Sequence, residues 1–163
     1  MDTERYNLSE RVGLVLKEKK MIVVTAESCT GGLLAASITD VPGSSAYFER
    51  GFVVYSDVAK QEDLGVKSQT LERFGAVSEQ VACEMAEGAL RHSHATVGVA
   101  ITGIAGPTGG SKDKPIGTIC FALVCLELSI KAVTMHFDGD RRSIRMQAVK
   151  FALESLSKNL VRS

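Results

Sequence analysis

The run TVGVAIT, residues 96–102, places the strongest constraint on how this 163-residue chain can fold. It is apolar at nearly every position and lacks the alternation of polar and apolar residues that marks a strand with one solvent-exposed face. Such a run is typical of a central strand that is covered on both faces. Since helices must then lie on both sides of the sheet, the run favours a layered α/β fold.

Strand-like and helix-like segments alternate around this run. Further strands are expected at residues 21–25, 51–55, 116–126 and 130–137, with 126–129 as a hairpin turn between the last two. Helices are expected at residues 7–20, 30–39, 57–64, 78–92 and 141–160. The order predicts one domain, residues 1–163, with a three-layer α/β/α fold and a mixed sheet of about five strands.

Capping residues and apolar spacing support two of these helices. Asn7, with Glu10 three residues later, is expected to cap the first helix. The apolar side of that helix is formed by Leu8, Val12, Leu14, Val15 and Leu16. Ser78 is expected to cap the helix that follows it.

Composition excludes several classes of protein. Lys plus Arg equals Asp plus Glu at 19 each, so the chain lacks the basic excess of a general nucleic-acid surface. No apolar run approaches the ~20 residues that span a bilayer, and the charged start MDTERYNLSERV is unlike a signal peptide. Four cysteines without CxxC pairing agree with a reducing compartment. We therefore expect a cytoplasmic protein that binds neither nucleic acid nor membranes.

Three polar segments are expected beyond the carboxyl ends of the strands, where open α/β sheets bind ligands: residues 27–32, 55–60 and 102–110. In the first, TAESCTGG places Ser28 at a strand-to-helix turn, where the positive end of a helix can stabilise an oxyanion. The GxSxG pattern of the usual hydrolase elbow is absent. The alternative is that Ser28 or Thr30 merely caps the helix.

Cys29 is the rival nucleophile in this segment. A catalytic cysteine usually needs a histidine or another group that stabilises the thiolate. The three histidines, His92, His94 and His136, lie outside the polar segments. Cys29 is therefore interpreted as a small packing residue.

A serine nucleophile without a histidine needs another base, and a partly desolvated lysine can serve. Lys60 ends the stretch GFVVYSDVAK, close to the predicted strand end at Tyr55. The alternative is an ordinary solvated lysine, and the local pattern alone does not distinguish Lys60 from Lys67.

Two further motifs could bind an anion. The loop GIAGPTGG could offer backbone amides, although it is neither a P-loop nor GxGxxG. In DGDRRSIR, three arginines crowd a helix start, where acidic residues are usually preferred. A phosphate site and a surface ion-pair network with Asp138 and Asp140 both explain them. No His/Cys/Asp cluster has metal-ligand spacing, so no metal is expected.

Taken in order, these segments resemble the CinA C-terminal domain family. The resemblance is carried by AESCTGG, VPGSSAYFERGFVVYSDVAK, LGV, GAVSE, ITGIAGPTGG, KPIGT and FDGDR. It implies a stand-alone nicotinamide-nucleotide amidase that needs no cofactor and lacks the additional N-terminal domain of longer members. Its small-molecule substrate would be nicotinamide mononucleotide, hydrolysed to nicotinate mononucleotide and ammonia. A homo-oligomer is compatible with this resemblance.

The resemblance also implies roles for single residues. Ser28 matches the nucleophile and Lys60 the general base, and Tyr55 and Thr102 match polar positions close to them, which we expect to be catalytic as well. The substrate-binding residues that we expect are Cys29, Thr30, Gly31, Gly32, Ser44, Ser45, Gly103, Ile104, Ala105, Gly106, Arg141, Arg142 and Arg145. Amides near Thr30 and Gly31 are expected to hold the oxyanion, and the arginines the 5′-phosphate. The alternative function is a non-catalytic regulatory protein that binds a pyridine nucleotide.

Overall fold

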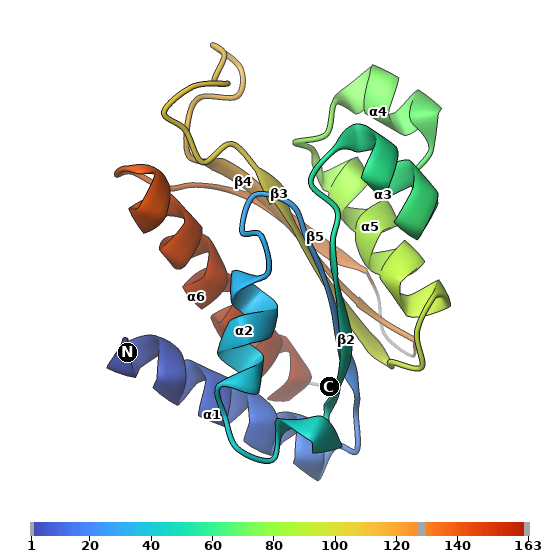
Figure 1. Ribbon diagram of the computed structural model, residues 1–163, viewed down its shortest axis with the longest axis vertical. Coiled ribbons are helices and arrows are strands. Elements are labelled where there is room, and N and C mark those ends of the chain that lie inside the picture. Colours follow the sequence, from blue (N-terminus) through green and yellow to red (C-terminus); the bar gives the residue numbers. More distant parts are fainter. Residues whose placement is uncertain (1, 127–129, 162–163) are drawn as a thin grey trace.

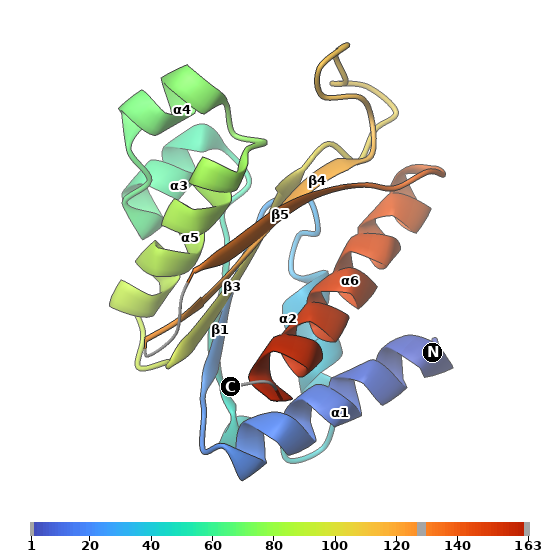
Figure 2. The same ribbon diagram turned by 180° about the vertical axis from the view of Figure 1, so that it is seen from behind.

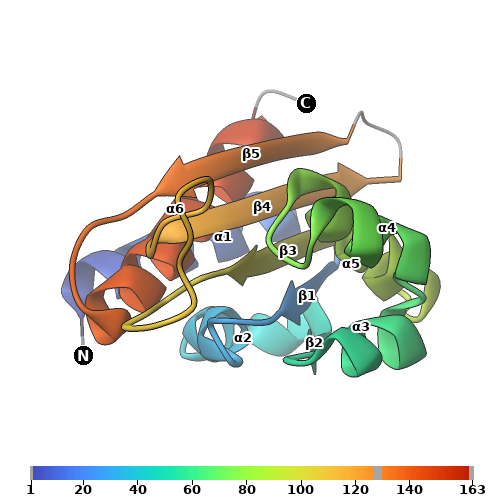
Figure 3. The same cartoon turned by 90° about the horizontal axis from the view of Figure 1, so that it is seen from above.

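A single mixed sheet organises the protein, for which a computed structural model describes residues 2–126 and 130–161. Its strands are β1 (Val23–Glu27), β2 (Phe48–Val53), β3 (Val97–Gly103), β4 (Thr118–Cys125) and β5 (Lys131–His136). They lie in the order β2–β1–β3–β4–β5, as the view from above shows (Figure 3). Strand β1 pairs in parallel with β2 and β3, whereas β3–β4 and β4–β5 are antiparallel.

Helices cover both faces of this sheet. They are α1 (Thr3–Glu18), α2 (Leu33–Thr39), α3 (Asp57–Leu64), α4 (Ser68–Phe74), α5 (Glu79–Arg91) and α6 (Arg141–Val161). Helices α1, α2 and α6 lie on one side, and α3, α4 and α5 lie on the other (Figures 1 and 2). The predicted three-layer α/β/α fold with a mixed five-stranded sheet is confirmed.

Strand β3 lies at the centre of the sheet, which explains its apolar run. Val97, Val99 and Ile101 pack into the core on the side of α1 and α6. Ala100 packs into the second core, on the side of α5. Alternate residues therefore meet different helix layers, and both faces exclude water.

The start of α1 corrects one prediction. The helix begins four residues before Asn7, and Asp2 caps it: its Oδ1 accepts hydrogen bonds from the amides of Glu4 at 3.1 Å and Arg5 at 3.3 Å. The prediction that Asn7 caps the helix was wrong, because the carboxylate of Asp2 is a better acceptor and lies about one turn earlier. Leu14 was also wrongly assigned to the apolar side, since 69% of it is exposed. Ser78 does cap α5, accepting from the amide of Val81 at 3.2 Å.

Other differences concern element boundaries. Strand β1 begins and ends two residues later than expected, and β2 begins three residues earlier. Helix α4 was missed because it buries no residue and has no side-chain cap. The turn expected at 126–129 lies mostly outside the described residues. No helix in the described ranges is long and apolar enough to cross a membrane.

Candidate active site

The turn that follows β1 presents Ser28 at the carboxyl edge of the sheet. The Ser28 amide donates to the carbonyl oxygen of Ile101 at 2.9 Å, which joins it to the neighbouring strand β3. Gly31 and Gly32 then take φ values of +56° and +100°, in the left-handed region that favours glycine. These two glycines reverse the chain into α2 within a few residues of the serine.

Glu27 fixes this turn from within the core, and the sequence analysis missed it. Its carboxylate is fully buried and accepts hydrogen bonds from the Thr30 hydroxyl at 2.6 Å and from the amides of Leu34 at 2.8 Å and Ala35 at 3.1 Å. The carboxylate therefore occupies the amino end of α2 that we expected to face a ligand. An acidic residue closing an apolar run was the signal available in the sequence.

Lys60 projects from α3 to Ser28. Register explains the approach: Glu27 pairs with Val53, so the residue after β1 lies beside the residues after β2. The Lys60 Nζ donates to the Ser28 Oγ at 3.1 Å and to the carbonyl oxygens of Val54 at 3.1 Å and Tyr55 at 3.2 Å. Only 1% of Lys60 is exposed, so it is not the solvated lysine of the alternative interpretation.

Burial sets the ionisation of two groups in this site. It lowers the pKa of Lys60 from its ordinary value of 10.5, against a smaller opposing effect of the Asp57 carboxylate. It raises the pKa of the Cys29 thiol to about 12, and the charge of Glu27 adds to this rise. The amine is thus shifted toward its neutral form, whereas Cys29 remains a thiol.

Arg141, at the start of α6, joins two of the loops around Ser28. It donates to the hydroxyl of Tyr55 at 2.8 Å and to the carbonyl oxygen of Gly106 at 2.7 Å. The hydroxyl of Thr102 donates to the carbonyl oxygen of Ala76 at 2.9 Å, which links β3 to the segment before α5.

These groups surround a cavity of about 260 Å³. Its walls are formed by Ser28, Cys29, Tyr55, Asp57, Lys60, Ala76, Val77, Thr102, Gly103, Ile104, Ala105, Gly106, Thr108, Gly109 and Arg141. The structure therefore brings the three predicted polar segments together. Asp57 is a charged member of this wall that the sequence analysis did not select.

Several predicted site residues lie outside this wall. Thr30, Gly31 and Gly32 form the turn behind Ser28. Arg145 donates to the carbonyl oxygens of Cys29 at 3.0 Å and Thr30 at 3.2 Å, so it holds the turn from α6. Arg142 is exposed and does not line the cavity.

Ser44 and Ser45 are also absent from the wall. They form a short 3-10 turn just before β2. Because β1 and β2 are parallel, this turn lies at the opposite end of the sheet from Ser28.

The start of α6 has its own neutralising carboxylate. Asp140 Oδ1 accepts from the amide of Ser143 at 2.8 Å, and the Asp140 carbonyl accepts from the amide of Ile144. Arg141 and Arg145 turn toward loop carbonyls. The described contacts of these two arginines are therefore not those of the surface ion-pair network considered above.

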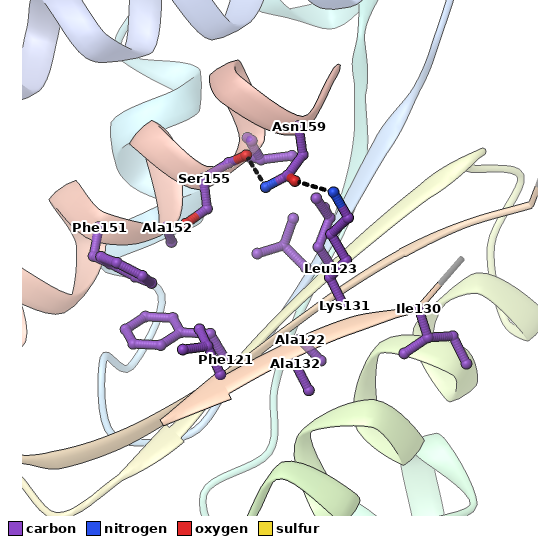
Figure 4. Close-up of a pocket in the computed structure, with 13 residues that line it drawn as sticks. Phe121, Ala122, Leu123, Ile130, Lys131, Ala132, Phe151, Ala152, Ser155 and Asn159 are labelled. Atoms are coloured by element: carbon purple, nitrogen blue, oxygen red, sulfur yellow. Dashed lines mark hydrogen bonds between the residues drawn. The ribbon is translucent and has the colours of Figure 1, made fainter. Parts of the chain in front are cut away.

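A second, larger cavity of about 500 Å³ lies between β4, β5 and α6 (Figure 4). Its wall is mainly apolar, and its charged member, Lys131, donates to the Asn159 side chain at 2.7 Å. Ser155 also lines it, but the hydrogen bond of Lys131 goes to Asn159 and not to that serine, so we place the candidate chemistry in the smaller cavity. No group of three His, Cys, Asp or Glu side chains within 2–126 and 130–161 is arranged to hold a metal ion.

The fold and this site define a three-layer α/β protein with a buried serine–lysine pair at the carboxyl edge of its sheet. Residues 5–160 match the description "CinA C-terminal domain", and the chain belongs to that family. It is 51% identical to nicotinamide-nucleotide amidohydrolase PncC of Escherichia coli K12, over 95% of this chain and 94% of the relative. It is 48% identical to the protein of that name from Enterobacter agglomerans, over 97% and 96%.

A solved structure of a competence/damage inducible protein from Agrobacterium tumefaciens is similar throughout. It superimposes with a TM-score of 0.93 at 44% identity and covers 97% of this chain and 96% of its own. The resemblance stated from sequence motifs is thus confirmed over nearly the whole chain.

Proposed function

We propose that this protein is a nicotinamide-nucleotide amidase, which hydrolyses the carboxamide of nicotinamide mononucleotide to nicotinate mononucleotide and ammonia. Relatives of that name match nearly its full length at about half identity. The observation that carries the proposal is the buried contact of 3.1 Å between Lys60 Nζ and Ser28 Oγ. It supports Ser28 as the nucleophile and Lys60 as its general base.

The surroundings of Lys60 suit a neutral amine. Such an amine has two N–H groups and one lone pair. The carbonyl oxygens of Val54 and Tyr55 can only accept, so they take the two N–H groups. The lone pair then points to Ser28, whose hydroxyl donates to the carbonyl oxygen of Tyr55 at 3.4 Å and can rotate to donate to the amine instead. This is the arrangement that a base needs before the serine attacks.

The reaction we propose is acyl transfer in two stages. Ser28 Oγ bonds to the amide carbon as Lys60 takes its proton, and the collapse of the intermediate returns that proton to the departing ammonia. Lys60 then takes a proton from water, the resulting hydroxide attacks the ester carbon, and the Ser28 oxygen leaves as Lys60 gives it that proton, which releases nicotinate mononucleotide and restores both residues. We assign the oxyanion to the amide of Cys29, which lines the cavity, since Thr30 lies behind the wall and the Gly31 amide already donates to the Ser28 carbonyl at 3.1 Å.

The nucleotide would enter from the side of Arg141. That guanidinium lines the cavity and still has N–H groups beyond its two described bonds. Residues 103–106 line the same wall; the Ile104 amide already donates to the carbonyl oxygen of Thr118 at 2.9 Å, which leaves the amides of Ala105 and Gly106 as candidate donors. A phosphate held there is remote from the amide bond, so its binding energy can position the carboxamide against Ser28.

Ammonia release from nicotinamide mononucleotide by the purified protein tests this function. Turnover that disappears in a folded Ser28→Ala protein supports it. Nucleotide binding without any turnover by the native protein would instead favour the alternative, a regulatory binding protein. We further propose that residues 1–163 act as one domain in the cytoplasm. A homo-oligomer is compatible with this function, and sedimentation of the purified protein tests whether one forms.

A further inference from the structure

Asp57 places a negative charge in the wall of the candidate cavity. It is the first residue of α3 and lies three positions before Lys60, so the two side chains project from one side of the helix. The amide of Ala59 is capped by the Ser56 hydroxyl at 3.0 Å, so Asp57 does not perform that task. Within the described residues, the Asp57 side chain has no hydrogen bond or ion pair, and the residue is exposed.

Arg141 supplies the opposite charge at another part of the wall. It contacts the hydroxyl of Tyr55, whereas the main-chain carbonyl of Tyr55 contacts Lys60. Arg141 is therefore separated from the amine of Lys60 by about the length of the Tyr55 side chain. The cavity therefore carries opposite charges at different places. The carboxylate of Asp57 lies near the Ser28–Lys60 pair, and the guanidinium of Arg141 lies further from it.

The charges of the proposed substrate have the same order. The ring that bears the carboxamide is a pyridinium with a positive charge on its nitrogen, and the phosphate lies beyond the ribose. With the carboxamide at Ser28, the ring charge falls on the side of Asp57 and the phosphate on the side of Arg141. We propose that Asp57 recognises the pyridinium charge and selects quaternary nicotinamide nucleotides over uncharged carboxamides. This inference rests on the proposed function of the site.

Asp57 also has an ordinary structural explanation, since a carboxylate in the first turn stabilises a helix. That role would affect every ligand of the cavity alike. Recognition of the ring charge would instead depend on the ligand. An analogue of the same shape that keeps the phosphate but has an uncharged ring separates the two.

The experiment compares the binding of two ligands to variants that lack Ser28 and so cannot hydrolyse them. Nicotinamide mononucleotide and benzamide ribotide, whose ring has carbon in place of the charged nitrogen, are titrated calorimetrically into Ser28→Ala protein. The same titrations use Ser28→Ala combined with Asp57→Asn, or with Asp63→Asn as the matched control. Asp63 is an exposed carboxylate of the same helix that does not line the cavity.

Asp57→Asn is expected to weaken binding of the charged nucleotide roughly fivefold, the upper range for a solvent-accessible ion pair. Binding of the analogue with the uncharged ring should stay the same, and Asp63→Asn should change the binding of neither ligand. The difference should shrink at high salt. Equal weakening of both ligands, no weakening, or no binding of either ligand would overturn the inference. Ammonia release by the native protein is measured separately, so loss of the proposed function and loss of this inference give different results.

Discussion

The hydroxyl of Thr30 donates a hydrogen bond to the carboxylate of Glu27 across 2.6 Å, and both side chains are fully buried. The same carboxylate accepts two amides from the start of α2. Glu27 is the residue immediately before Ser28, so this bond determines the path of the chain through the candidate nucleophile. The turn is held by a buried carboxylate on the side of the core.

Glu27→Ala is expected to lower the free energy of unfolding by about 3 kcal/mol, because it leaves a hydroxyl and two amides without their acceptor. Turnover should fall with it, since the Ser28 turn loses its support. Urea unfolding monitored by circular dichroism measures the change. Glu62→Ala, an exposed carboxylate of α3, is the control and should stay within about 0.5 kcal/mol of the native protein. Equal stability of the two variants would contradict this role of Glu27.

Ser28→Ala should fold normally and lose activity by several powers of ten, as expected for a removed nucleophile. Ammonia release and a thermal melt on the same preparation provide the test. Cys29→Ser is the neighbouring control and should retain activity, because the high pKa of that thiol keeps it from acting as a thiolate. Near-native turnover by Ser28→Ala would remove the serine from the mechanism.

Lys60→Met is expected to lower kcat by roughly 10²–10⁴, the usual contribution of a general base. Lys67→Met should not, since Lys67 does not line the cavity. In the native protein, kcat/KM should rise with pH through the pKa of Lys60, which burial places below 10.5. A Lys60→Met protein with the native rate and pH profile would require a different base.

Stability should depend on pH through the same group. Since burial lowers the pKa of Lys60 in the folded state, the unfolded chain binds more protons between that pKa and 10.5. The free energy of unfolding of the native protein, relative to Lys60→Met, should therefore rise with pH across that window. Urea unfolding of both proteins at a series of pH values gives the difference. A flat or falling difference would contradict the burial of the amine.

Arg141→Gln should reduce kcat/KM for nicotinamide mononucleotide roughly 10–100-fold, which corresponds to a charged hydrogen bond of about 1.5–3 kcal/mol. The kcat/KM for the riboside, which lacks the phosphate, should fall little. Arg142→Gln is the adjacent control and should change neither substrate, because Arg142 lies outside the cavity wall. An equal fractional loss for both substrates would mean that Arg141 serves the loops it joins and not the phosphate.

Much of the fold could be predicted because burial leaves a direct pattern in the sequence. The β3 run is typical of a strand covered on both faces, and Ser78 marks the start of α5. Helix α4 leaves no such pattern, since it buries no residue. The cap at Asp2 was missed because two acceptors, Asp2 and Asn7, were available in the first turns.

The candidate site was predictable where it follows from topology. Ser28 and Lys60 lie in segments that end neighbouring parallel strands, so their approach follows from the pairing of β1 with β2. The contacts of Glu27 and the exposure of Asp57 to the cavity depend on the three-dimensional path of the turns, which no local pattern specifies. For the same reason, sequence motifs alone did not separate Arg141 from Arg142.

Two of the three partners of Lys60 Nζ are carbonyl oxygens, at Val54 and Tyr55. A carbonyl group is present whichever amino acid occupies a position. A side-chain replacement at position 55, which lines the cavity, can therefore alter the cavity's shape while both carbonyl acceptors of the amine persist. What the cavity admits can change at this position without loss of the groups that anchor the lysine.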